Sequence, residues 1–427
     1  MEYLRKNHDN LAIILMIVMM VFQNSLFKLL AGIIPAFDVS YNPPWLCALY
    51  VLIIVAVYGL VLVPRVVGKT GIRGICSQYK GLICELAILL LAIVSVDAVT
   101  LIRGQLRITN IFTHNLDYFY AFLALPIVIL LAEGEWKIES MVRTMVILTV
   151  VSGIMRFAVS YYFGVTGIEI QCISRESAIE GWMRNGRLRM VAPCMSMLLM
   201  PILVYFCVKA ETVLWRLFYG AGFVFNVFYV YYVWQSRACI IYTLASLGVM
   251  LMFWPMSKKL TRIKWGAAGL CVIGFFMFGG MQILIDQFST DESSKYFMEN
   301  RGHYNVYKCF IEKYLRSPIF GDGLTETLAE WFGDRALWLT DGGLLYSIVP
   351  MGILMIVFFV FVLCRGISIY VKTYRQNDMA ILALAIIALV FACGVSIDFF
   401  MTGICFSVPF YLAIVEYVAV RYRSGDR

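Results

Sequence analysis

The sequence predicts an all-α, polytopic integral membrane protein with about 12 transmembrane helices, and three observations support this prediction. Of the 427 residues, 61% are hydrophobic and only 15% are charged, whereas a soluble chain carries about 25% charged residues. The mean hydropathy is +0.82. Apolar runs of the length that crosses a bilayer core recur along the whole chain. Such a chain cannot cover itself with polar side chains, so lipid is expected to be its main solvent.

The apolar runs give the expected helices in chain order. The first run is long enough to remain as a span, and no A-x-A-like cleavage site of a signal peptide is visible. The fourth run is short, and the last two share a tight connection. The expected spans are residues 11–34, 45–63, 84–102, 117–132, 144–163, 190–208, 217–234, 239–255, 265–285, 344–364, 379–399 and 402–420.

The basic residues predict the orientation of these spans. Short loops rich in Lys and Arg stay in the cytoplasm, and with the N-terminus inside, the basic loops Ser257–Lys264 and Arg365–Asp378 both fall inside. An even number of spans then places both termini in the cytoplasm. The net charge of +8 is therefore interpreted as a topology signal, and no nucleic-acid partner is expected.

We expect residues 1–427 to form a single polytopic membrane domain without repeats. Two long segments would face outward, residues 164–189 and a large loop at 286–343 before the tenth helix. Within the large loop, Glu299–Arg316 has the spacing of an amphipathic helix. Thr325–Gly333 is expected to form a second short helix at the membrane surface.

The 12 cysteines and three histidines do not suggest a metal centre. No C-x-x-C pair occurs, and the histidines are scattered along the chain. Most cysteines lie in apolar runs, where the side chain behaves as a small hydrophobe. No metal is therefore predicted.

Charged residues inside spans are rare and need an explanation. They either pair with one another or line a polar cavity that opens outward. Glu85 and Glu416 lie near the cytoplasmic side and are expected to reach the interface. No acid–base pair is predicted through the inner half of the bundle, which argues against an ion-coupled transporter. The charged residues in the outer halves of spans are Lys28, Asp97, Arg156 and Asp398.

Four outward arginines form a second pattern. Arg187 and Arg189 precede the sixth span, Arg237 stands in the outer turn between the seventh and eighth, and Arg301 begins the helix of the large loop. The planar guanidinium suits phosphate oxygens, so arginines that converge on an outward cavity would suit a diphosphate. The alternative is that each only binds lipid headgroups or loop carboxylates.

Asp341 stands directly before the tenth span and has two possible roles. It could be the N-cap of that helix. It could also be a general base, because a carboxylate at the edge of a low-dielectric cavity can have a raised pKa and accept a proton from a sugar hydroxyl.

Three short motifs resemble those of the polytopic O-antigen polymerases (Wzy) and the related O-antigen ligases. The first is Ser236-Arg237 at the start of an apolar span. The second is the large late loop with an Arg-led helix followed by SPIFGDGL, Ser317–Leu324. The third is Asp341-Gly342-Gly343, followed by an apolar span that contains a glycine. In the ligases a histidine usually occupies the place of Asp341, so the base stays open between Asp341, His303 and Asp322.

The resemblance implies a metal-independent glycosyltransferase without a cofactor in the bacterial cytoplasmic membrane. Its donor would be a sugar chain on undecaprenyl diphosphate and its acceptor another lipid-linked repeat unit, with no nucleotide sugar. A chain-length regulator and a flippase would be its protein partners. The product would be a surface polysaccharide, namely an O-antigen, a capsule or an exopolysaccharide.

The chemistry of such a transfer assigns the candidate residues. Fixed arginines can stabilise the departing diphosphate, and a base must accept the proton of the attacking hydroxyl. The predicted catalytic residues are Asp341, Arg237 and Arg301. The predicted substrate-binding residues are Arg187, Arg189, Arg156, His303, Asp322 and Tyr304. The alternatives are a ligase, or a flippase or transporter for the same lipids, although no repeat relates the two halves of the chain as in many transporters.

Overall fold

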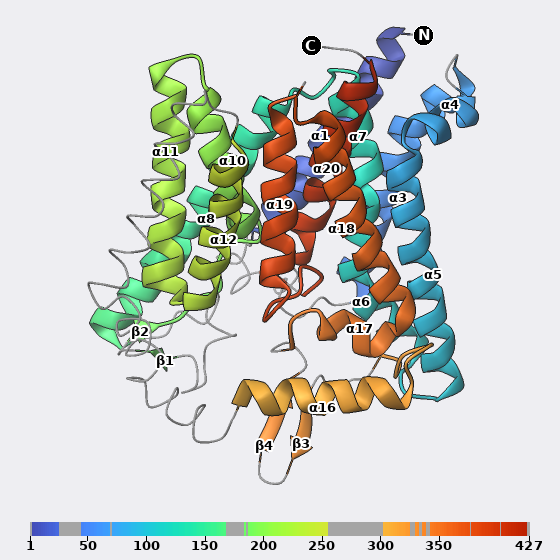
Figure 1. The fold of residues 1–427 in the computed structure, drawn as a ribbon, viewed down its shortest axis with the longest axis vertical. Coiled ribbons are helices and arrows are strands. Elements are labelled where there is room, and N and C mark those ends of the chain that lie inside the picture. The colour runs from blue at the N-terminus through green and yellow to red at the C-terminus, as the bar shows by residue number, and fades with distance from the viewer. Residues whose placement is uncertain are drawn as a thin grey trace.

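The computed structural model describes most of the chain as a helical bundle with two short β-hairpins (Figure 1). The described residues are 2–24, 44–68, 71–167, 183–184, 187–254, 302–324, 329–332, 335–338, 342–375, 377–401 and 403–424. The predicted span 265–285 and Lys28 lie outside them. Among the described residues, 7 helices are long and apolar enough to cross a membrane, and three shorter apolar helices accompany them. The prediction of a helical membrane protein is therefore confirmed.

The N-terminal half contributes the following elements: α1 (Glu2–Gln23), α3 (Pro44–Val67), α4 (Gly71–Gln78), α5 (Lys80–Ile102), α6 (Ile108–Phe119), the 3₁₀ turn η3 (Tyr120–Leu123), α7 (Ala124–Ala132), α8 (Ile138–Thr166), β1 (Met183–Arg184), β2 (Arg187–Leu188), α10 (Ser196–Lys209), α11 (Val213–Phe228), the π-helical segment η5 (Tyr229–Trp234) and α12 (Arg237–Phe253).

The C-terminal half contributes α16 (Gly302–Arg316), β3 (Ala329–Phe332), β4 (Arg335–Trp338), α17 (Leu345–Met351), α18 (Ile353–Thr373), α19 (Met379–Cys393), the 3₁₀ turn η7 (Cys405–Ser407) and α20 (Val408–Ser424). The predicted helix Glu299–Arg316 is confirmed over its described part, which is α16.

The bundle has two groups of helices joined by α19 (Figure 1). Helices α8, α10, α11 and α12 form one group, and α1, α3, α5, α7, α18 and α20 form the other. Helix α19 packs against α10 and α12 on one side and against α18 and α20 on the other. Helix α1 begins and α20 ends at the same end, which we call the terminal end, and α16 lies across the opposite end, which we call the α16 end.

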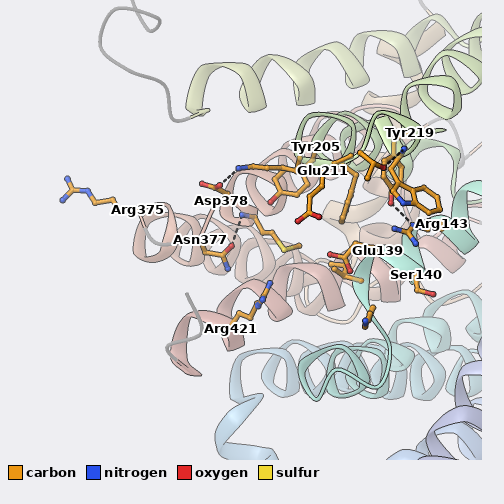
Figure 2. Close-up of a pocket in the computed structure, with 18 residues that line it drawn as sticks. Glu139, Ser140, Arg143, Tyr205, Glu211, Tyr219, Arg375, Asn377, Asp378 and Arg421 are labelled. Carbon is orange, nitrogen blue, oxygen red and sulfur yellow. Dashed lines mark hydrogen bonds and ion pairs between the residues drawn. The ribbon is translucent and has the colours of Figure 1, made fainter. Parts of the chain in front are cut away.

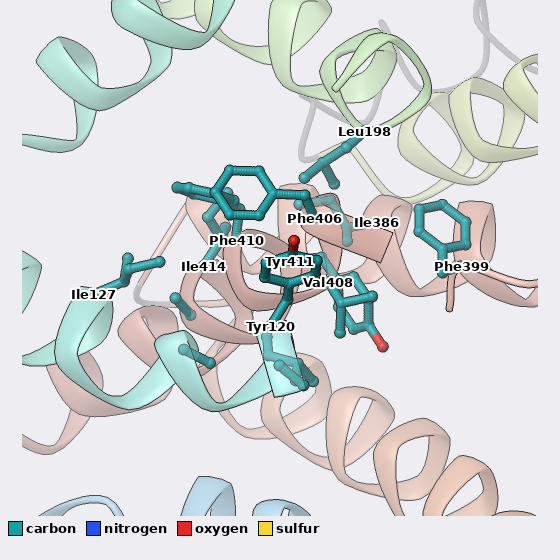
Figure 3. Close-up of a cluster of buried hydrophobic side chains, with 14 of the residues drawn as sticks. Tyr120, Ile127, Leu198, Ile386, Phe399, Phe406, Val408, Phe410, Tyr411 and Ile414 are labelled. Carbon is teal, nitrogen blue, oxygen red and sulfur yellow. The ribbon is translucent and has the colours of Figure 1, made fainter. Parts of the chain in front are cut away.

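The centre of the bundle is formed by α20 and the stretch Thr113–Ala132. In the most apolar 18 residues of each segment, 89% of the residues are buried in the segment that contains α20 and 83% in Thr113–Ala132. The corresponding share in the other long helices is 28–39%. Aromatic rings fill the centre (Figure 3). Tyr120 meets Phe406 edge to face at 5.2 Å, a favoured aromatic geometry. The outer helices leave apolar side chains exposed, as Leu52, Val55 and Leu244 do, which suits helices that face lipid.

A proline explains how the central helix is joined to α3. Pro126 has no backbone N–H to donate to the carbonyl of Phe122, four residues earlier. That carbonyl instead accepts a hydrogen bond from the Tyr58 hydroxyl of α3, at 2.6 Å. The short 3₁₀ turn η3 lies at this place. The Phe122 carbonyl, which lacks a partner in its own helix, thus forms a hydrogen bond between the central helix and α3.

Two ion-pair clusters hold the bundle nearer the terminal end. Arg65 of α3 contacts both carboxylate oxygens of Asp9 at 2.8 and 3.1 Å, and both oxygens of Glu133 at 2.9 and 2.8 Å. Its side chain is only 2% exposed. In the second cluster, Arg365 of α18 pairs with Glu85 of α5 at 2.6 Å and with Glu416 of α20.

This second cluster corrects the expectation that Glu85 and Glu416 only reach the interface. Their side chains are 2% and 0% exposed, because each meets Arg365 inside the bundle. The same observation overturns the prediction that no acid–base pair lies in that half of the bundle. The pairing joins residues far apart in the chain, which spacing in a single sequence does not reveal.

Replacing Arg365 with methionine should destabilise the protein by about 3–5 kcal/mol, because it leaves two buried carboxylates without their cation. Thermal or denaturant unfolding in detergent measures the change. The triple variant Arg365→Met/Glu85→Gln/Glu416→Gln removes the charges together and should recover most of the stability. If the triple variant is as unstable as the single one, packing and not charge holds α5, α18 and α20 together.

Both hairpins lie in the two long segments that the sequence places outside. In the first, Arg184 pairs with Arg187, so the two residues between the strands are Asn185-Gly186, a common hairpin pair. In the second, Phe332 pairs with Arg335, across Gly333-Asp334. The predicted helix at Thr325–Gly333 is therefore wrong over 329–332, which form a strand, because this Gly-Asp pair favours a hairpin.

Candidate functional site

The start of α12 is the most unusual backbone in the described chain. Helix α11 ends in the π-helical segment η5, and Gln235 follows with φ 53°. It is the one non-glycine residue with positive φ among those described, a conformation that costs about 1–2 kcal/mol. Its neighbours are Ser236 and Arg237, the first motif of the resemblance. Both π-helical segments and strained residues are enriched at functional sites.

The segment after β2 is fixed against this strained turn. The backbone N–H of Met190 donates to the carbonyl of Val233 at 3.4 Å. Arg189 Nε donates to the carbonyl of Trp234 at 3.2 Å, three residues before Arg237. Arg189 therefore lies beside the start of α12, as the idea of converging arginines requires.

Helix α8 fixes the same segment from the other side. Arg156 Nη1 donates to the carbonyl of Val191 at 2.7 Å, and Ser160 Oγ donates to the carbonyl of Leu188 at 2.7 Å. Arg187 belongs to β2, directly before this segment. The structure thus gathers Arg156, Arg189, the strand of Arg187 and the backbone of Arg237 at the α16 end. The side chains of Arg187 and Arg237 lie outside the described residues.

The predicted site residues of the large loop are placed only in part. Arg301 and Asp341 lie outside the described residues. His303 and Tyr304 belong to the first turn of α16, and only their backbone is described. One turn later on α16, the side chain of Tyr307 is half-buried.

Asp322 forms ion pairs and hydrogen bonds with residues of other helices and loops. Its carboxylate pairs with Arg103 at 2.9 Å and with Lys313 at 3.2 Å, and Arg103 Nη1 also donates to the backbone carbonyl of Asp322 at 2.8 Å. Gln105 Nε2 donates to the same carbonyl at 2.9 Å. Because each carboxylate oxygen of Asp322 contacts a cation, this geometry favours a structural clamp over a general base.

The SPIFGDGL motif caps two helix ends at once. The N–H groups of Asp322 and Gly323 donate to the carbonyls of Val349 and Pro350 at the end of α17, and Ile353 at the start of α18 donates to the carbonyl of Ile319. Helix ends need such external partners. A Cβ on Gly321 would lie 2.0 Å from the Pro350 carbonyl oxygen, so only glycine fits. The second and third motifs are therefore docked on each other.

The residues that follow Asp341 are docked on the end of α19. Leu344 N donates to the carbonyl of Gly394 at 2.9 Å. Two residues after Gly394, Ser396 shares a hydrogen bond of 2.6 Å with Tyr242 of α12. The connection after α19 thus links the start of α17, next to Asp341, with the first turns of α12, next to Arg237.

A buried polar cluster beneath α17 was not identified as a unit from the sequence. Tyr118 donates to Ser347 Oγ at 3.2 Å, Cys405 Sγ donates to Asp117 at 3.2 Å, and Phe400 N donates to Asp398 Oδ1 at 2.9 Å. Asp398 lies in the connection between α19 and α20, and it is 0% exposed. In the sequence, Asp398 stands out only as a charged residue in the outer half of the predicted span 379–399. The described contacts of Asp97, Arg156 and Asp398 are to other polar groups, not to one another.

Within the described residues, no cluster of three or more His, Cys, Asp and Glu side chains has the arrangement of a metal site. Comparison with models of known protein families finds no match, and comparison with curated proteins finds none either. The resemblance to the O-antigen polymerases and ligases therefore stays a prediction that depends on the three motifs and on their placement at one end of a helical membrane bundle.

Proposed function

We propose that the chain is a metal-independent glycosyltransferase that polymerises undecaprenyl-diphosphate-linked oligosaccharide repeat units into a surface polysaccharide. The observation that supports it best is the arrangement around Arg189. Its guanidinium lies against the strained turn that leads to Ser236-Arg237, and the segment that carries it is held by Arg156. Cations gathered at one end of a membrane bundle suit a lipid diphosphate.

The proposed topology is the one that the sequence predicts. Twelve spans in a bacterial cytoplasmic membrane would place both termini in the cytoplasm and the α16 end outside. The long loop before the tenth span would then lie over the site, with α16 at the membrane surface.

The proposed mechanism uses side chains alone. Arg237, with Arg189 or Arg187, would stabilise the charge that develops on the diphosphate as the glycosidic bond breaks. Arg301 would help to hold donor or acceptor. Asp341 would accept the proton of the attacking hydroxyl, while Tyr304 would pack on a sugar ring. A single displacement of this kind inverts the anomeric carbon.

The direct test uses purified protein in detergent with a pool of lipid-linked repeat units and no added metal or nucleotide. A ladder of sugar lengths on the lipid carrier supports the polymerase. Transfer of glycan to a different final acceptor, with no ladder, supports the ligase reading instead.

A flippase for the same lipids is the second candidate, and one observation favours it. The ion pairs of Arg365 with Glu85 and Glu416 remove the argument that the bundle interior lacks paired charges. Movement of a fluorescent lipid-linked sugar across liposomes, with no new glycosidic bond, would support the flippase and contradict the polymerase.

A further inference from the structure

A groove with a volume of about 760 Å³ is lined by the residues drawn in Figure 2. It lies at the terminal end of the bundle in Figure 1, opposite the proposed active site. Its walls come from the start of α8, the end of α10, the start of α11, the turn between α18 and α19, and the end of α20. It therefore lies between the two helix groups. Nothing in the proposed glycosyl transfer uses it.

The groove carries an excess of positive charge. Its basic lining residues are Lys137, Arg143, Lys209, Arg375 and Arg421, and its acidic ones are Glu139, Glu211 and Asp378. Lys209 and Asp378 pair with each other. The remaining cations outnumber the remaining acids, so the groove as a whole favours an anion.

Arg143 is held in the groove by aromatic groups. Its guanidinium lies 3.5 Å from the ring centroid of Trp215, and its Nε donates to the Tyr219 hydroxyl at 3.4 Å. Among the described residues it forms no ion pair. Stacking fixes the plane of the guanidinium without neutralising it, and this leaves its charge available to phosphate oxygens.

The surface next to the groove is apolar. On the first turns of α11, Val213, Leu214 and Leu217 are 68%, 71% and 66% exposed. Val208, near the end of α10, is 55% exposed. In a membrane-spanning bundle such faces contact acyl chains. A ligand at this place would meet cations and hydrocarbon-facing residues together.

We propose that this groove binds the phosphate-bearing headgroup of an anionic phospholipid, with its acyl chains along α11. The phosphate would meet Arg143, and Arg421 of α20 would supply the cation of the opposite wall. A soluble phosphate compound shares the phosphate chemistry, but it would make no use of the exposed apolar face of α11.

The experiment measures binding of fluorescent phosphatidylglycerol and phosphatidylcholine to the full-length protein in a neutral detergent. Wild type should bind phosphatidylglycerol about tenfold more tightly than phosphatidylcholine, and Arg143→Ala should abolish that preference, as loss of one charge-assisted contact predicts. Arg421→Gln changes an exposed residue of the opposite wall and should weaken binding about threefold. Arg73→Ala is the matched control, because Arg73 is exposed on α4 at the same end, outside the groove.

Three results would overturn the proposal. Equal binding of the two lipids by the wild type would remove the selectivity for anions. If Arg73→Ala weakened lipid binding as much as Arg143→Ala, binding would depend on the overall positive charge of this end and not on a specific site. Displacement of the lipid by millimolar pyrophosphate would assign the groove to a soluble phosphate compound. Gel filtration of each variant confirms that the protein is folded.

Discussion

Arg237→Ala should abolish the ladder of polymer lengths, with the rate of chain extension falling at least about a hundredfold, as removal of one fixed donor to a developing negative charge does elsewhere. The physical reason lies in the backbone. The strained Gln235 and the π-helical segment before it fix the start of α12 beside Arg189. A diphosphate that leaves without a metal needs such fixed cations.

The measurement compares extension rates of purified variants on the same lipid-linked repeat units. Arg107→Ala is the matched control, because Arg107 is an exposed arginine just before α6, in the α5–α6 connection that reaches Asp322 at the α16 end. It removes the same charge and should leave the ladder intact. Arg237→Lys should recover only part of the activity, since an ammonium lacks the planar fork. A full-length ladder from Arg237→Ala would contradict the role given to this residue.

The sequence predicts structure that depends on residues close together in the chain. It does not predict contacts between residues far apart in the chain. Amphipathic spacing is local, and it predicts α16 correctly. The pairing of Arg365 with Glu85 and Glu416 joins three helices, and spacing along one chain contains no sign of it. Asp322 is a candidate base in the sequence, and its partner Arg103, 219 residues away, is revealed only by the structure.

Two local signals in the sequence favour the hairpins. Asn185-Gly186 and Gly333-Asp334 each separate strands that pair in the structure, and both are typical hairpin pairs. The π-helical end of α11 is different. Its geometry depends on packing, since the same residues have a continuous apolar pattern that predicts only a helix.

Gly343→Ala should destabilise the protein by several kcal/mol and should greatly reduce activity. Gly343 has φ +58°, and a Cβ there would lie 2.1 Å from the carbonyl oxygen of Gly394 and 2.7 Å from the carbonyl carbon of Val395. The left-handed backbone alone costs about 1–2 kcal/mol for alanine. The contact with backbone atoms cannot be relieved by turning a side chain, so α17 would have to move away from the end of α19.

The same motif supplies the control. Gly342 does not have a positive φ, and a Cβ on it would meet Leu345 Cβ at 3.3 Å and Phe310 at 3.9 Å, contacts that small shifts relieve. Gly342→Ala should therefore stay near wild-type stability. Unfolding in detergent and chain extension are measured on both variants. Equal stability of the two would contradict the docking of Gly343 on Gly394.

The activity of Gly343→Ala bears on Asp341, two residues earlier. If Asp341 is the base, moving the start of α17 by about 1 Å should lower the rate about a hundredfold, even in the fraction that remains folded. If Asp341 is only an N-cap, activity should follow the folded fraction alone. The rate per folded molecule therefore separates the two roles, and it does so through a glycine whose own chemistry is inert.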